Sequence, residues 1–141
     1  MTDAALVEKK LAQIETYVAE LRNLARPADL GHDVREERFV EHTLQLAIQA
    51  ALDVASHIVS DDRLGEPRTN RDLFDLLQRR GYLTADLSNT LRNMAGFRNV
   101  LVHGYDAVDL AIVRDILEHH LVDLLSFVSA IRRLIVPGKD T

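Results

Sequence analysis

The chain has 141 residues, 47% of them hydrophobic and 28% charged, with no cysteine and a formal net charge of −5. This balance excludes a disordered chain, a disulfide scaffold, a thiolate metal site and a protein that coats nucleic acid through bulk positive charge. The length predicts a single domain over residues 1–141. No apolar run approaches the roughly 18 residues of a membrane span and the N-terminus lacks a secretory pattern, so we expect a cytoplasmic protein without membrane contact.

The first two helices are predicted from the spacing of hydrophobic side chains. Over residues 3–25 these recur every three or four positions, which indicates a helix with a narrow apolar stripe that Pro27 closes. Asp33 and Glu36 have the spacing of a capping box. Beyond them the helical period continues to the turn-rich residues 61–67, so the second helix is long.

A short third helix and a fourth helix follow. Asn70 is positioned to cap the third helix, and Gly81, after two arginines, is typical of a helix stop. Thr84 can cap the fourth helix, which we expect to end or bend at Gly104. Residues 63–98 carry seven arginines and four acidic side chains, so this part of the chain is locally basic.

The fifth helix is predicted to open at Asp106 and Asp109 and to end at Pro137. Its hydrophobic side chains cover more than one face, which is typical of a helix buried in a core or against another subunit. No segment alternates as a strand would. We therefore expect an all-α fold, an antiparallel bundle of about five helices.

The fourth helix also carries the residues with the clearest chemistry. Arg98 supplies a permanent cation and His103 a titratable imidazole, with Asn99 four residues before the histidine. In metal-independent RNA cleavage, histidine can serve as base and acid while arginine neutralises the transition state. Residues five apart point about 140° from each other on a straight helix. Arg98 and His103 therefore converge only if the helix breaks near Gly104 or a second copy completes the site.

The stretch from Gly96 to Tyr105, in which an arginine is followed after four residues by histidine and then by x-Tyr, resembles the signature of the HEPN superfamily and, within it, of the HepT-like toxins. Supporting matches on the predicted second helix are Glu37-Arg38, Leu52-Asp53-Val54-Ala55 and His57-Ile58. The resemblance implies a HEPN-like domain, a two-fold homodimer and a metal-independent endoribonuclease toxin of a type II or type VII-like toxin–antitoxin system.

The resemblance also implies a role for each residue of the motif. Arg98 and His103 map onto the catalytic residues, with Asn99 as a polar helper. Tyr105 maps onto the tyrosine that a cognate MNT-type nucleotidyltransferase antitoxin modifies with adenylate. Such an adduct would bring negative charge to the place where the RNA phosphate must bind, and it would occupy Arg98. The expected partners are thus RNA, the antitoxin and a second copy, with no cofactor.

Two further residues lie on the predicted second helix. Asp53, among apolar neighbours, could support Arg98 or His103 from a facing helix, or it could be a structural acid. His57 shares its helix face and could pair with it. The other histidines lack metal-ligand spacing with acidic partners, so no metal site is expected.

Two alternatives to the ribonuclease remain open at this point. Related helical proteins are non-catalytic nucleotide- or substrate-binding companions of nucleotidyltransferases, and that role does not need the imidazole as an acid or base. A purely structural oligomeric bundle is the other alternative, and it leaves the motif unexplained.

Overall fold

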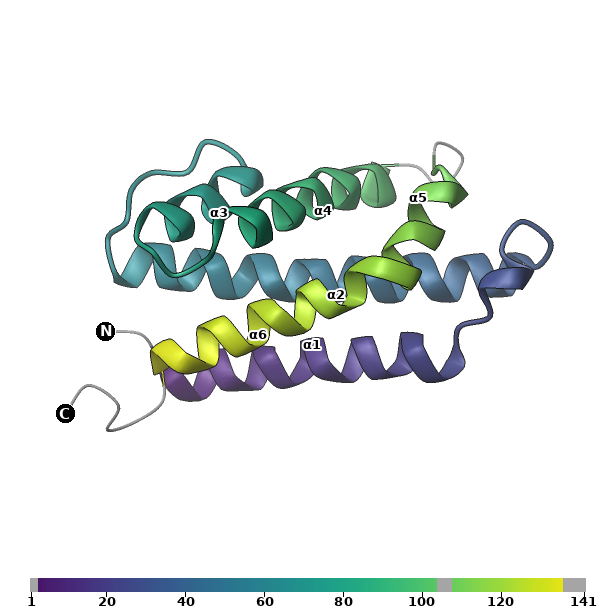
Figure 1. Cartoon of the computed structure of the whole chain (residues 1–141), viewed down its shortest axis with the longest axis horizontal. Coiled ribbons are helices and arrows are strands. Elements are labelled where there is room, and N and C mark those ends of the chain that lie inside the picture. Colours follow the sequence, from purple (N-terminus) through teal and green to yellow (C-terminus); the bar gives the residue numbers. More distant parts are fainter. Residues whose placement is uncertain (1–2, 104–107, 136–141) are drawn as a thin grey trace.

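All regular structure in residues 3–103 and 108–135, the part of the chain that the computed structural model describes, is helical (Figure 1). The elements in chain order are α1 (Ala4–Leu24), the 3-10 helix η1 (Pro27–Asp29), α2 (Val34–Asp61), α3 (Asn70–Arg79), α4 (Ala85–His103), α5 (Leu110–Asp115), the π-helical turn η3 (Ile116–His120) and α6 (Leu121–Ile135). The last three follow one another without interruption and correspond to the predicted fifth helix. The prediction of an all-α bundle of about five helices is confirmed.

The long helices alternate in direction along the bundle (Figure 1). α1 packs against α2 and α6, while α4 packs against α2, α3 and α6. The short α3 lies within the connection from α2 to α4 and contacts both of these helices. α4 therefore has neighbours along its length and presents its C-terminal end next to α5 at one end of the bundle (Figure 1).

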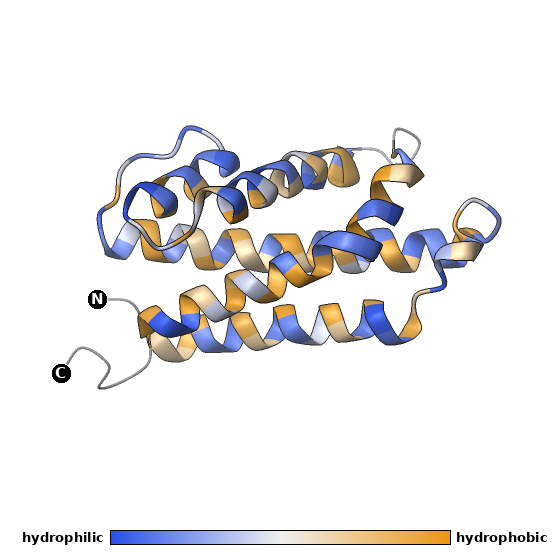
Figure 2. Cartoon of the chain, in the orientation of Figure 1, coloured by the Kyte–Doolittle hydropathy of each residue, from blue (hydrophilic) through white to orange (hydrophobic). Residues whose placement is uncertain are grey.

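The helices share one core of buried hydrophobic side chains, and several of them carry these side chains on one side only (Figure 2). α1 shows the predicted narrow stripe, formed by Val7, Leu11, Ile14, Val18 and Leu21. The rings of Phe74 in α3 and Phe127 in α6 meet edge to face, with centroids 5.9 Å apart, a favourable geometry for aromatic pairs. Burial of these faces stabilises the bundle because it removes apolar surface from water.

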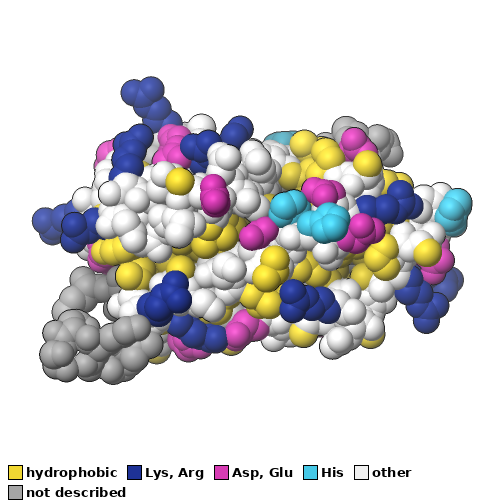
Figure 3. All heavy atoms as spheres, in the orientation of Figure 1, with side chains coloured by type: hydrophobic (Ala, Val, Ile, Leu, Met, Phe, Trp, Pro, Cys, Tyr) yellow, Lys and Arg dark blue, Asp and Glu magenta, His cyan; other side chains and the backbone are white. Residues whose placement is uncertain are grey.

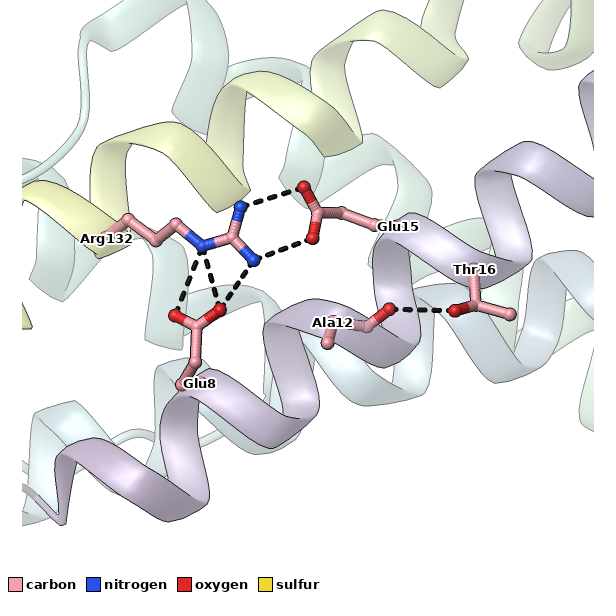
Figure 4. A network of polar contacts seen from close by, with 5 residues as sticks. All are labelled: Glu8, Ala12, Glu15, Thr16 and Arg132. Carbon is pink, nitrogen blue, oxygen red and sulfur yellow. Dashed lines mark hydrogen bonds and ion pairs between the residues drawn. The ribbon is translucent and has the colours of Figure 1, made fainter.

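An ion-pair network joins α6 to α1 on the outside of the bundle (Figure 4). The Arg132 guanidinium donates to both carboxylate oxygens of Glu8, at 2.6 to 3.1 Å, and to both of Glu15, at 2.6 and 2.8 Å. Hydrogen bonds from Arg132 lower the pKa of Glu15 and outweigh the opposing effect of burial. The network links the first and last helices of the bundle by side-chain contacts.

One predicted helix cap was wrong, and a second prediction was right only in part. The third helix is capped by Thr69 rather than Asn70, because the Thr69 hydroxyl and the Asp72 carboxylate form a reciprocal capping box. Asp33 does cap α2, accepting a hydrogen bond from the Arg35 backbone N–H at 2.9 Å. Glu36 does not complete a box with it, since its carboxylate accepts from the backbone N–H of Arg26 at 2.6 Å and ties the preceding loop to α2.

Other predicted boundaries are confirmed. Gly81 has a φ of +85°, the left-handed conformation that favours glycine after a helix. The Asp109 carboxylate caps α5 by accepting from the Ala111 N–H at 2.9 Å. Asp106, Gly104 and Pro137 lie outside the described residues. Within residues 3–103 and 108–135, no helix combines the length and the apolarity needed to cross a bilayer.

Candidate functional site

α4 carries the motif on a regular helix that continues to His103. It begins behind Thr84, whose hydroxyl accepts from the Leu87 N–H at 3.2 Å as predicted. Leu91, Met94 and Leu101 are buried and hold the helix against the core. The orientation of the motif is therefore set by this apolar packing.

Arg98 leaves α4 close to the core side of the helix. Its side chain is half-buried, and its Nε atom is buried without a hydrogen-bond partner among the described residues. One terminal nitrogen, Nη1, donates to the amide oxygen of Asn99 at 3.4 Å. In the described part of the chain no carboxylate pairs with this guanidinium, in contrast to those of Arg92 and Arg132. Its positive charge is thus uncompensated there.

Asn99 and His103 lie on the outer side of α4. Both are exposed, and their spacing of four residues makes them neighbours on one helix face. His103 is the last residue of α4. An amide and an imidazole thus face solvent together.

Arg98 and His103 of one chain do not share a face. Because α4 is helical through His103, the two side chains leave the axis about 140° apart and about 7.5 Å apart along it. A bend at Gly104 would lie beyond both residues and would leave this angle unchanged. A helix break and a second copy of the chain were the two ways to bring these side chains together. Because the helix is uninterrupted between them, the second copy is the way that remains. Tyr105 lies outside the described residues.

The polar contacts of Asp53 go to residues outside the motif in this chain. Its carboxylate accepts from Gln49 Nε2 at 2.8 Å and from Lys10 Nζ of α1 at 3.4 Å. Among the described residues, no hydrogen bond or ion pair joins it to Arg98 or His103. A supporting role for Asp53 stays a prediction.

His57 pairs with a different carboxylate from the one expected. Its Nε2 lies 3.2 Å from an oxygen of Asp61, four residues on, so the contact is local to α2. No group of three histidine or acidic side chains within residues 3–103 and 108–135 is arranged to hold a metal ion.

Sequence reasoning missed two polar features. Glu41 of α2 is only 3% exposed, and this burial, with a smaller contribution from Glu37, raises the pKa of its carboxyl. In the η3 turn, His120 lies between Asp115 and Asp123. The adjacent Val40 and Leu44 hint at burial of Glu41, but nothing in the spacing of Asp115 and His120 predicts their contact, because it depends on the π-helical turn.

Comparison with known proteins gives a consistent result. Residues 8–131 match the family model described as ribonuclease HepT-like. The chain is 39% identical over 128 residues to the mRNA nuclease HepT of Shewanella oneidensis, covering 90% of this chain and 96% of that protein. It is 31% identical over 109 residues to the tRNA nuclease HepT of Aphanizomenon flos-aquae, covering 76% and 74%.

Solved structures agree with these sequence relatives. The tri-AMPylated HEPN toxin of Shewanella oneidensis in complex with its MNT antitoxin superimposes with a TM-score of 0.84 and 32% identity, over 94% of this chain and 98% of that one. The cytosolic protein YutE of Bacillus subtilis, at 20% identity, shares the fold with a TM-score of 0.85 over 95% of this chain and 91% of that one.

Proposed function

Because this chain belongs to the ribonuclease HepT-like family, we propose that it is a metal-independent endoribonuclease toxin. In this proposal it acts in the cytoplasm as a two-fold homodimer. A nucleotidyltransferase antitoxin of the MNT type silences it. The nuclease names of its relatives and the toxin–antitoxin complexes among its structural neighbours support this function.

The observation that carries the proposal is the unbroken course of α4. Arg98 and His103 of one copy point away from each other, yet metal-free phosphodiester cleavage needs a cation and an imidazole at the same phosphate. A two-fold axis beside α4 brings Arg98 of one protomer to His103 of the other. The dimer is thus part of the catalytic site rather than an addition to it.

An exposed apolar side chain on α4 supports such an axis. Val102 is 42% exposed and lies between Arg98 and His103 around the axis of the helix. A valine side chain is stabilised when a partner surface removes it from water. Contact between copies here would bury Val102 and bring the two motifs together.

In the proposed reaction each composite site uses His103 of one protomer and Arg98 of the other. The His103 imidazole takes the proton of a ribose 2′-hydroxyl, whose oxygen attacks the adjacent phosphorus. The imidazolium gives that proton to the 5′-oxygen as its bond to phosphorus breaks, which leaves a cyclic phosphate and a free 5′-hydroxyl. Arg98 neutralises the charge that builds on the non-bridging oxygens, and Asn99 orients the phosphate by hydrogen bonding.

Cleavage of RNA by the purified chain tests this function. In EDTA, wild-type protein is expected to cut RNA, while Arg98→Ala and His103→Ala lose at least about a hundredfold in rate, the usual loss for a catalytic acid or base. Expression of the wild type, and not of these variants, should arrest growth. Arg133→Ala and His119→Ala, at exposed residues of α6 and η3, are the matched controls and should behave as wild type.

Two outcomes would contradict the proposal. A His103→Ala protein that cleaves RNA as fast as wild type would exclude the imidazole from catalysis. Wild-type protein that binds RNA or nucleotide without cutting would favour the non-catalytic companion of a nucleotidyltransferase.

Regulation by the antitoxin is proposed to act at Tyr105. Its phenol oxygen attacks the α-phosphorus of ATP, pyrophosphate leaves, and an adenylate remains two residues from His103. The added charge competes with the RNA phosphate for Arg98. Intact-mass measurement after incubation with the neighbouring nucleotidyltransferase and ATP should show adenylate on wild type and none on Tyr105→Phe. An adduct that persists in Tyr105→Phe would place the modification elsewhere.

A further inference from the structure

A cavity of about 390 Å³ and several smaller hollows mark the surface of the described chain, and one of the smaller ones adjoins the motif. This cavity, of about 150 Å³, lies between α4 and the α5–η3 segment. Its lining includes Asn93, Met94 and Phe97 of α4 with Asp115, Ile116 and His120. Phe97 directly precedes Arg98, so the cavity adjoins the motif along α4. We propose, on the basis of the function above, that this cavity binds one base of the RNA substrate and sets sequence preference.

The acidic edge of the cavity is held in place by a histidine. His120 Nε2 lies 3.2 Å from Asp115 Oδ2, and its Nδ1 lies 2.9 Å from Asp123 Oδ2. On a regular α-helix, residues five apart such as Asp115 and His120 would point about 140° from each other. The π-helical turn η3 removes this separation, and such turns are frequent at functional sites. In Figure 3, histidine and acidic side chains lie together beside hydrophobic ones in this region.

An accessible stripe of α4 connects the cavity to the proposed catalytic residue. Asn93, Gly96, Val100 and His103 follow one another at spacings of three and four, so they share one face, and none of them is buried. Asn93 and His103 are ten positions apart, about 15 Å along the helix. A short single-stranded segment of RNA can therefore reach from His103 to the cavity.

Gly96 has no side chain to obstruct the middle of this stripe. A Cβ built there would meet one heavy atom of the described chain within 4 Å, the Nη1 of Arg71 at 4.0 Å. Glycine within a helix is less stable than alanine, and the neighbours in this chain leave room for a methyl group. The missing side chain leaves the path along α4 open, and the Arg71 guanidinium lies beside it, where it can contact an RNA phosphate.

The size of the cavity and the residues that line it indicate which part of an RNA it can bind. The cavity is smaller than the roughly 300 Å³ or more of sites for drug-sized ligands, so it accommodates one base rather than a nucleotide. The Asp115 carboxylate repels phosphate and accepts hydrogen bonds without donating any. It therefore favours a base with an exocyclic amino group, and Asn93 can read a second atom of the base edge above the apolar floor. Uracil, which has no amino group, is disfavoured.

Sequencing of the cut ends of a randomised RNA tests the proposal. Wild type is expected to prefer adenine, cytosine or guanine over uracil at one fixed position near the cut, by about tenfold. Asp115→Asn replaces an acceptor by a group that also donates and should remove most of this preference. Asn93→Ala, at an exposed residue, should alter the preference at the same position. Glu118→Gln, an exposed acid of the same turn outside the cavity, is the matched control and should cut as wild type does.

The outcomes separate this inference from the function on which it rests. Arg98-dependent cleavage with the same base preference in wild type, Asp115→Asn and Asn93→Ala would overturn the base pocket and leave the ribonuclease standing. Unchanged preference together with weaker binding of the nucleotidyltransferase to Asp115→Asn would show that the cavity serves a protein partner, which also overturns it. Failure of wild type to cut any RNA would instead remove the proposed function.

Discussion

The Arg98 side chain is half-buried, although the proposed function requires it to reach an RNA phosphate. Its Nε lies buried near the core side of α4, and the chain supplies no carboxylate partner for it within the described residues. A guanidinium held this way keeps its positive charge available for a phosphate, because no internal acid neutralises it. A lysine at this position would keep the charge and lose the planar fork.

Glu41 provides a prediction about stability at the residue scale. Burial raises the pKa of its carboxyl, so the folded protein holds this proton more readily than the unfolded chain does. The free energy of unfolding therefore decreases as the pH rises through and above the ordinary glutamate value. Glu41→Gln should have a higher Tm than wild type at pH 7, and the difference should shrink as the pH falls below about 4. Thermal melts across this range measure it.

Glu66→Gln, at an exposed loop residue, is the control for this comparison and should leave the Tm unchanged at every pH. A Glu41→Gln protein that melts below wild type at pH 7 would mean that the buried carboxylate is stabilised by contacts that an amide cannot replace.

The motif could be identified from the sequence because its residues lie close together in the chain and have distinctive side-chain chemistry. The family and the enzyme class inferred from the stretch Gly96 to Tyr105 are confirmed, whereas the individual roles of Arg98, Asn99, His103 and Tyr105 stay predictions. The burial of Glu41 was not predicted, because burial depends on which helices pack against α2.

At the scale of elements, the network between α1 and α6 makes a second prediction. Arg132→Gln removes five hydrogen bonds to Glu8 and Glu15, all between partly exposed groups, and should lower the free energy of unfolding by about 1 kcal/mol. Because Arg132 lowers the pKa of Glu15, this stabilisation is fully present above the ordinary glutamate pKa and is lost as the pH falls below it, through the lowered pKa of the folded protein. Urea titrations at pH 7 and below pH 4 measure both effects.

Arg133→Gln is the matched control, since the neighbouring arginine is exposed and its change removes the same charge. It should leave the free energy of unfolding within about 0.5 kcal/mol of wild type. Equal losses in the two variants would assign the effect to net charge rather than to the network.

The helices themselves were predictable because hydrophobic spacing and cap residues act locally. Thr84, Gly81 and Asp109 behave as their residue types predict. Glu36 could not be assigned, because its partner is ten residues away across a turn. The π-helical turn at Ile116–His120 was equally hidden, because its hydrophobic spacing continues that of the flanking α-helices.

At the scale of the whole molecule, the proposed catalytic site depends on a second copy of the chain. The wide apolar surface predicted for the fifth helix is largely used within one chain, since Val113, Leu121, Leu124, Phe127 and Ile131 are buried in the core. Val102 of α4 remains 42% exposed, on the side of the helix between Arg98 and His103. The resemblance and the width of the fifth helix predicted a dimer, and the unbroken α4, which keeps Arg98 and His103 of one chain on different faces, supports it.

The most direct measurement is complementation between two inactive variants. Arg98→Ala and His103→Ala proteins, mixed and allowed to exchange subunits, form heterodimers in which one of two composite sites keeps both native residues. The mixture should regain about a quarter of wild-type ribonuclease activity if exchange is statistical, because half of the dimers then carry one intact site. Mixing Arg98→Ala with the double variant should regain none. A mixture of the two single variants that stays as inactive as either alone, with subunit exchange demonstrated, would contradict a site shared between protomers.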